Sequence, residues 1–121
     1  IRAKLHFYQT YVGEGNLRNA VSGNSPPVTS FLEILKSKCK KEDFVIVKLD
    51  IDTPEAELTI MGVISLRPDL AGLIDEMFFE YHYYFDGADF GWGQNVAGDV
   101  DSALSLFHRI RSLGVRLHFW I

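Results

Sequence analysis

The sequence feature that most constrains the fold is the segment of residues 44–57, FVIVKLDIDTPEAE, in which an apolar run leads directly into an acidic turn. A short, continuous and β-branched apolar run predicts a strand that is buried on both faces, as the central strands of parallel sheets are. Asp50 and Asp52 follow this run, so both carboxylates would lie at the C-terminal edge of the sheet. Open α/β sheets bind their ligands at this edge, and we therefore expect a functional site there.

Signals of a helix start follow the two aspartates. Thr53 is expected to cap the helix with its hydroxyl group, and Pro54 fits the first helical position, where a backbone N–H is not needed. Glu55 and Glu57 suit the positive end of the helix dipole. The segment therefore predicts a strand, an acidic turn and a helix, around which the other segments would pack.

Strands and helices alternate along the rest of the chain. The strands are expected at residues 3–12, 44–52, 76–85 and 115–121, and the helices at residues 30–40, 54–64 and 101–113. This alternation predicts βαβ crossovers, and thus an α/β fold with a mainly parallel sheet and flanking helices. Four strands are few for a doubly wound sheet, and residues 1–121 are interpreted as one domain or part of one. The start at Ile1 instead of Met favours processing or a longer parent protein.

Two of the helices carry recognisable end signals. Ser30 and Glu33 match the capping box of a helix start. Gly114 is expected to end the helix of residues 101–113. The inward positions of that helix are expected to be Leu104, Phe107 and Ile110.

Composition argues against several classes of protein. A net charge of −4 and the lack of a long basic run argue against a general nucleic-acid surface. No apolar stretch approaches the roughly 20 residues that span a bilayer, so no transmembrane segment is expected. Cys39 is the only cysteine, which excludes an internal disulfide and favours a buried, unreactive thiol. The sequence does not specify the compartment, although a reducing compartment or an organelle fits better than secretion.

Two pairs of polar residues would meet at the C-terminal edge of the sheet. Asp50 and Asp52 are expected to share one strand face, and Glu80 and His82 to do the same on the next strand. If the strands are neighbours, Asp50, Asp52 and Glu80 could hold a divalent cation such as magnesium, manganese or calcium. All four are candidate catalytic residues, since nearby carboxylates raise one another's pKa and so favour proton transfer. In the equally weighted structural alternative, the aspartates satisfy helix and loop N–H groups while Lys48 neutralises one of them.

Two known patterns share the D-x-D triplet of residues 50–52. Haloacid-dehalogenase phosphatases have an apolar strand followed by D-x-D-x-T, but here the threonine comes one position early and a helix replaces the flap. Metal-dependent glycosyltransferases use D-x-D to hold a nucleotide-sugar through manganese. A metal-dependent nucleotide-sugar transferase is therefore kept as a third alternative.

A further pattern covers more of the chain. The run K-L-D-I-D-T-P-E-A-E, followed by a strand ending in F-F-E-Y-H, resembles the C-terminal half of FkbM-type methyltransferases. Those proteins carry K-I-D-V-E-G-x-E on one strand, E-x-H at the end of the next, and a last helix that ends in L-G-hydrophobic. The resemblance spans residues 3–121 and is nearest to methyltransferase-like proteins of eukaryotic microorganisms. It implies a Rossmann-like domain with Asp50, Asp52 and Glu57 in the acidic motif and Glu80 and His82 on the following strand.

The chain departs from that family in two places. Thr53, Pro54 and Glu55 replace the glycine of the family's turn, which lengthens and stiffens the turn. The glycine-rich turn and the acidic residue that hold S-adenosylmethionine in this fold are absent from the sequence. The chain thus resembles the second half of the domain, and S-adenosylmethionine is expected to be the cofactor of the parent family without being bound by this chain alone.

Two functions from different classes follow. In the first, the parent protein is a methyltransferase-like enzyme whose carboxylates orient the acceptor or bind a metal that does so, with Glu57, Tyr84 and Trp92 contacting the substrate. In the second, the domain is a degenerate enzyme that serves as an accessory or interaction subunit. Other protein chains of a larger complex would then cover its exposed sheet edge and apolar helix faces. The sequence leaves open whether the chain is an enzyme.

Overall fold

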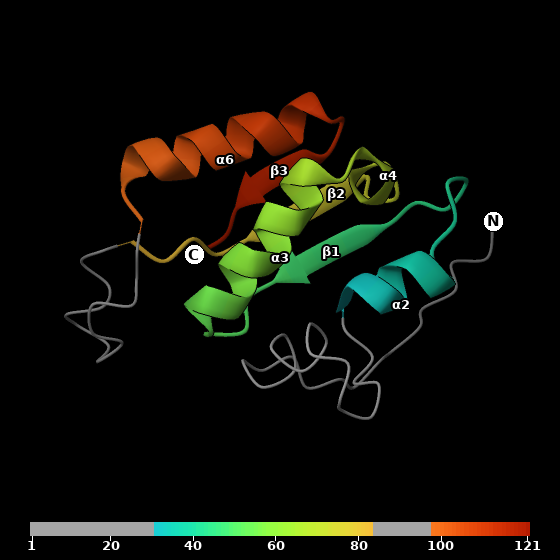
Figure 1. Ribbon diagram of the computed structural model, residues 1–121, viewed down its shortest axis with the longest axis horizontal. Coiled ribbons are helices and arrows are strands. Elements are labelled where there is room, and N and C mark those ends of the chain that lie inside the picture. Colours follow the sequence, from blue (N-terminus) through green and yellow to red (C-terminus); the bar gives the residue numbers. More distant parts are fainter. Residues whose placement is uncertain (1–30, 84–97) are drawn as a thin grey trace.

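The structure is a computed structural model that describes residues 31–83 and 98–121, and these residues form an α/β fold with a parallel sheet flanked by helices (Figure 1). The described strands lie in the order β1-β2-β3, and both neighbouring pairs are parallel. The predicted fold class is therefore confirmed. The expected strand of residues 3–12 and the candidate substrate residues Tyr84 and Trp92 lie outside the described residues. The elements are α2 (Phe31–Lys38), β1 (Ile46–Leu49), α3 (Pro54–Leu66), α4 (Pro68–Ala71), β2 (Glu76–Phe79), α6 (Val100–Ser112) and β3 (Arg116–Phe119).

The core lies between the sheet and the two long helices. The strand register aligns Val47 with Met77 and Met77 with Leu117, and all three side chains are buried on the same face. Helices α3 and α6 lie together across this face (Figure 1) and bury Ile60 and Phe107 against it. Burial of apolar side chains on one side of each strand and one side of each helix supplies the main favourable free energy of such a layer.

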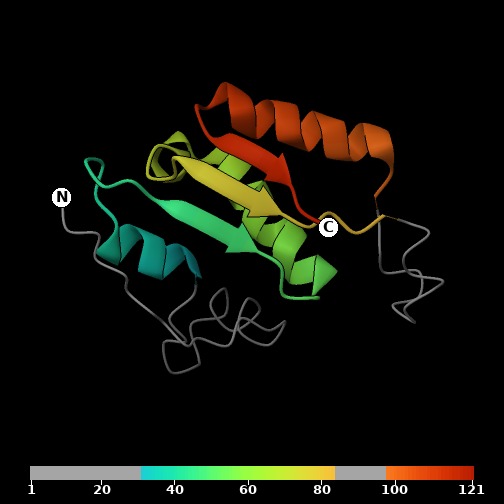
Figure 2. The same cartoon turned by 180° about the vertical axis from the view of Figure 1, so that it is seen from behind.

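The prediction that the strand at residues 44–52 is buried on both faces is wrong for the described structure. Burial alternates along β1, and the side chains of Phe44 and Ile46 are 64% and 57% exposed. Figure 2 shows this second face of the three strands with no described helix lying across it. In addition, β1 is an outer strand of the described sheet and β2 is the central one. A run of apolar residues cannot by itself distinguish a two-sided environment from an exposed apolar face.

The strands are shorter than predicted. β2 ends at Phe79 instead of residue 85, because its neighbour β1 ends at Leu49 and offers no further ladder partners. The ladder is closed by a hydrogen bond from the Glu80 N–H to the Leu49 carbonyl oxygen at 3.2 Å. The residues after Phe79 therefore leave the sheet at its carboxyl edge, where the candidate site residues lie.

Helix α6 buries Phe107 and Ile110 as predicted, but not Leu104. The side chain of Leu104 is 52% exposed, so its expected inward position is wrong, whereas Phe107 and Ile110 are buried as expected. Ala103 takes the third inward position, because spacings of three and four residues keep side chains on one helix face. Gly114 has a φ of 98°, a backbone conformation that favours glycine after a helix end, and the predicted stop is confirmed.

The other helices agree in position with the predicted segments. Helix α2 covers Phe31–Lys38 of the predicted residues 30–40, and Ser30 of the expected capping box lies outside the described residues. Cys39, which was expected to be buried, is only partly buried against the core, and this burial raises the pKa of its thiol. Among the described helices, none has the length and apolar character needed to cross a membrane.

Asp99 caps α6, because its Oδ1 accepts a hydrogen bond from the Ser102 N–H at 2.7 Å. This bond holds the pKa of Asp99 below its ordinary value of 3.8. The stabilisation is therefore present above pH 3.8 and is lost as the pH falls through the lower pKa of the folded state.

We expect Asp99→Ala to lower the melting temperature at neutral pH, and the difference from the wild type to shrink on acidification through that range. Asp101→Ala removes a carboxylate from the same first turn without removing the cap, so thermal unfolding should show a smaller loss. Equal losses in the two variants would contradict the capping role.

Candidate functional site at the carboxyl edge of the sheet

The turn after β1 begins the site. The chain leaves the strand at Asp50, and Asp52 takes a φ of 53°, in the left-handed region that aspartate and asparagine tolerate better than most residues. Thr53 occupies the cap position of α3, and Pro54 takes the first helical position as predicted. The expected side-chain cap is wrong, since the Thr53 hydroxyl donates to the Ile51 carbonyl oxygen at 3.2 Å instead.

Glu57 fixes this turn from within the helix. Its side chain is fully buried, with 0% of its surface exposed. Oε1 accepts a hydrogen bond from the Ile51 N–H at 3.0 Å, and Oε2 accepts one from the Thr53 N–H at 3.2 Å. The structural alternative for the aspartates assigned such N–H groups to Asp50 and Asp52, but Glu57 binds these two. One buried carboxylate therefore determines the path by which the acidic turn enters α3.

Glu57 also contacts the segment after β2. Its Oε2 lies 3.3 Å from Nε2 of His82, a side chain that is 7% exposed. Oε2 of Glu80 lies 3.7 Å from the same His82 nitrogen. Glu80 and His82 thus face the same side, as their spacing predicted, and the helix after β1 meets the exit of β2 at this point.

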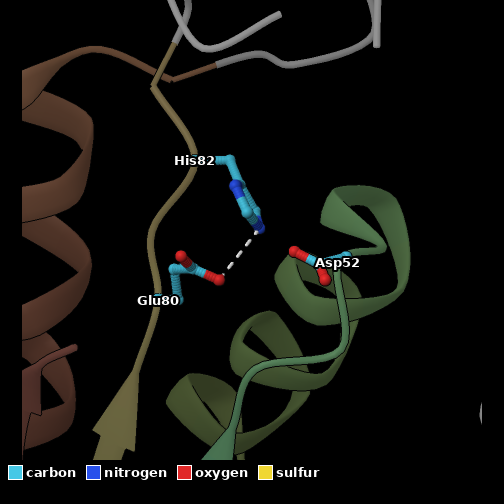
Figure 3. Close-up of side chains that lie close together, drawn as sticks. All are labelled: Asp52, Glu80 and His82. Carbon is cyan, nitrogen blue, oxygen red and sulfur yellow. Dashed lines mark ion pairs between the residues drawn. The ribbon is translucent and has the colours of Figure 1, made fainter. Parts of the chain in front are cut away.

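Asp52, Glu80 and His82 converge on one location (Figure 3). One ligand atom from each side chain lies within 4.8 Å of the ligand atoms of the other two. Asp52 is exposed, Glu80 is partly buried and His82 is buried, so the group extends from the surface into the interior. Side chains from two separate turns are therefore combined in one polar cluster.

Asp50 has a different partner from Asp52. Its Oδ2 accepts a hydrogen bond from Nζ of Lys48 at 2.6 Å, as the structural alternative expected for one of the two aspartates. The Lys48 Nζ also lies 4.4 Å from the ring centroid of Trp120. Asp50 borders the cluster without being one of the three residues that converge most closely.

The carboxyl groups of the site differ in their affinity for protons. Hydrogen bonding to Lys48 holds the pKa of Asp50 below its ordinary value. Burial raises the pKa of Glu80, and hydrogen bonding to Asp50 raises it further. Burial likewise raises the pKa of Glu57, although its two backbone N–H partners oppose the shift. Asp50 thus favours the charged form, whereas Glu80 accepts a proton more readily than an ordinary glutamate does.

The sequence predicted the location of this cluster better than its internal contacts. Asp50, Asp52, Glu57, Glu80 and His82 all come to the carboxyl edge of the sheet. For a metal, the sequence combined Asp50, Asp52 and Glu80, whereas the closest grouping in the structure has His82 in place of Asp50. The contact of Lys48 with Asp50 was predicted as one alternative, and the alternation of these residues on one strand face was its signal. The position of Trp120 beside Lys48 was not predicted.

The turn after β1 lacks the features of a site for an anionic nucleotide-like cofactor. The turn after β1 contains no glycine that would let a ligand approach the backbone closely. The N–H groups of Ile51 and Thr53 in this turn are already bonded to Glu57, so they are not available to an anionic group of a cofactor. The cluster itself is acidic and suits a hydroxyl group or a cation instead.

Comparisons with known proteins do not assign the chain to a family. No protein-family model matches the chain, and neither a curated protein nor a solved structure matches it.

Proposed function

We propose that the chain is a methyltransferase-like domain of the FkbM type whose carboxyl-edge cluster positions the acceptor of the methyl group. The observation that carries this proposal is the meeting of two motifs that are separate in the sequence. The acidic run that ends at Glu57 and the E-x-H triplet that ends at His82 approach to 3.3 Å between Glu57 Oε2 and His82 Nε2. These are the two motifs on which the resemblance to that family is based.

The residues of the cluster have distinct roles in this proposal. Glu57 is fully buried and holds the turn, so it takes a positioning role in place of the substrate contact expected from the sequence. Glu80 and His82 accept or hold the proton of an acceptor hydroxyl, for which the raised pKa of Glu80 is suitable. Asp50 stays charged beside Lys48 and orients the acceptor from the sheet side. Most of the acceleration in such a reaction would come from positioning.

S-adenosylmethionine is expected to bind only when residues beyond this sequence are present. By calorimetry, this chain alone should release no heat of binding, and the full product of its gene should bind the cofactor. In that full protein, Asp50→Asn combined with Glu80→Gln should abolish methyl transfer and leave cofactor affinity and circular dichroism unchanged.

Two results would overturn this proposal. If neither protein binds S-adenosylmethionine, the methyltransferase function is wrong. If the double variant unfolds, the two carboxylates are structural, and the assignment of acceptor positioning to them is wrong.

A second candidate is a non-catalytic accessory or interaction subunit. The observation that favours it is the exposed apolar surface on the open sheet face, where Phe44 is 64% and Ile46 57% exposed. Exposed apolar surface of this kind is typical of faces that other proteins cover. Lack of cofactor binding by the full protein, together with co-purification of a stoichiometric partner, would favour this function over the first.

A further inference from the structure

We propose that Asp52, Glu80 and His82 form a binding site for one divalent cation of the Mn²⁺ to Zn²⁺ series. One ligand atom from each lies within 4.8 Å of the other two. Asp52 comes from the turn after β1, and Glu80 and His82 from the segment after β2, so the site forms only when the two strands are paired. The site rests on the function proposed above and deepens it, since a bound cation would hold the acceptor hydroxyl in place of direct proton transfer to Glu80 and His82. Cation binding is measurable without acceptor or cofactor.

The spacing of the three ligand atoms is close to that around a shared ion. Ligands bound at about 2.0–2.2 Å from a metal lie about 3.0–3.5 Å from each other. Nε2 of His82 and Oε2 of Glu80 are 3.7 Å apart, so a small rotation brings both to a common ion. Figure 3 shows the carboxylate of Asp52 facing the other two side chains, and its exposed position allows it to adjust.

A second observation points to a ligand at this place. Oε2 of Glu80 is buried, and Nε2 of His82, at 3.7 Å from it, is too distant for a hydrogen bond. A buried carboxylate oxygen is costly unless it has a hydrogen-bond donor or a cation. The imidazole of His82, only 7% exposed, directs Nε2 toward the same oxygen. A cation between the three side chains would satisfy the buried oxygen of Glu80.

The ligand set selects the class of cation. Magnesium and calcium prefer sites made of oxygen atoms, whereas an imidazole nitrogen favours zinc and the transition metals. Two carboxylates neutralise the charge of a divalent ion, and the carboxyl group of Glu57 lies at the border of the site. Three protein ligands leave a coordination position open, which is the pattern of catalytic rather than structural zinc sites. That open position is where an acceptor hydroxyl or a water molecule would bind.

Calorimetry with Zn²⁺ alone tests the site. We expect the wild-type chain to bind one Zn²⁺ at least about tenfold more tightly than Mg²⁺. His82→Ala and Glu80→Gln should each weaken Zn²⁺ binding by at least about 10–100-fold. Replacing a group that only hydrogen-bonds to a metal ligand already lowers metal affinity by this factor. Asp52→Asn is the decisive variant, because it removes the charge of an exposed residue. Asparagine also tolerates the φ of 53° at this position, so this variant should fold, as circular dichroism would check.

His118→Ala is the matched control. His118 also lies beside a glutamate, with Nε2 2.9 Å from Oε1 of Glu76, but it is not part of the cluster. Its replacement should leave Zn²⁺ affinity unchanged. Lack of saturable Zn²⁺ binding by the wild type, unchanged affinity in Asp52→Asn, or tighter binding of Mg²⁺ would overturn the proposal. None of these results depends on S-adenosylmethionine, so failure of the cation site and failure of the methyltransferase function are separately detectable.

Discussion

Glu57→Ala is expected to lower the free energy of unfolding by about 2–4 kcal/mol in urea denaturation. Glu57 accepts two backbone hydrogen bonds, at 3.0 Å and 3.2 Å, and hydrogen bonds to a charged group contribute about 1.5–3 kcal/mol each. The net loss is smaller than the sum of the two bonds. Burial raises the pKa of Glu57, which means that its charged form is costly in the folded protein, and alanine removes that cost.

The matched control for this variant is Glu55→Ala in the same first turn of α3. Glu55 is exposed, so its replacement should change the free energy of unfolding by no more than about 0.5 kcal/mol. Glu57→Gln adds a second comparison, because glutamine has one acceptor oxygen and would leave one of the two N–H groups facing its amide. A Glu57→Ala protein as stable as Glu55→Ala would show that the buried carboxylate does not hold the turn.

Phe107→Ala is expected to cost about 3–5 kcal/mol, the usual loss for a large aromatic side chain removed from a core. Phe107 is 1% exposed and stacks on Phe119 with ring centroids 3.7 Å apart and on Phe79 at 6.1 Å. Alanine would therefore leave a cavity between α6 and the sheet. The change in the free energy of unfolding is measured by urea denaturation, with Phe107→Leu as a milder variant that retains a folded state.

Leu104→Ala on the same helix is the control for Phe107→Ala. The side chain of Leu104 is 52% exposed, so its truncation should cost much less than that of Phe107. Similar losses at the two positions would mean that the face of α6 that packs on the sheet has been assigned incorrectly.

The sequence predicts the layers of this fold better than its exposed surface. The alternation of strands and helices predicted the parallel sheet correctly, and the Pro54 and Gly114 signals locate helix ends to within one or two residues. The apolar run at residues 44–47 was misinterpreted, because an exposed apolar face and a buried one have the same composition. Only the arrangement of the helices in space decides between them.

The sequence predicted where the cluster lies, but not all of the contacts within it. Parallel strands bring their carboxyl ends to one edge, which is enough to associate Asp52 with Glu80 and His82. The role of Glu57 was not predictable, because a glutamate in the first turn of a helix is already explained by the helix dipole. Its return to the N–H groups of Ile51 and Thr53 depends on the path of the turn. No local pattern specifies that path.

The ladder that ends with the Glu80 N–H also limits how the chain could change in length during evolution. Glu80 and His82 follow directly after a strand whose register is fixed, and successive side chains alternate between faces. One residue inserted between Phe79 and Glu80 would therefore turn both groups away from Glu57. The junction of α3 and α4 at Arg67 lies toward the opposite end of the strands, where insertions would leave the cluster intact. The chain can thus acquire new loops at one end of the sheet without losing the chemistry at the other.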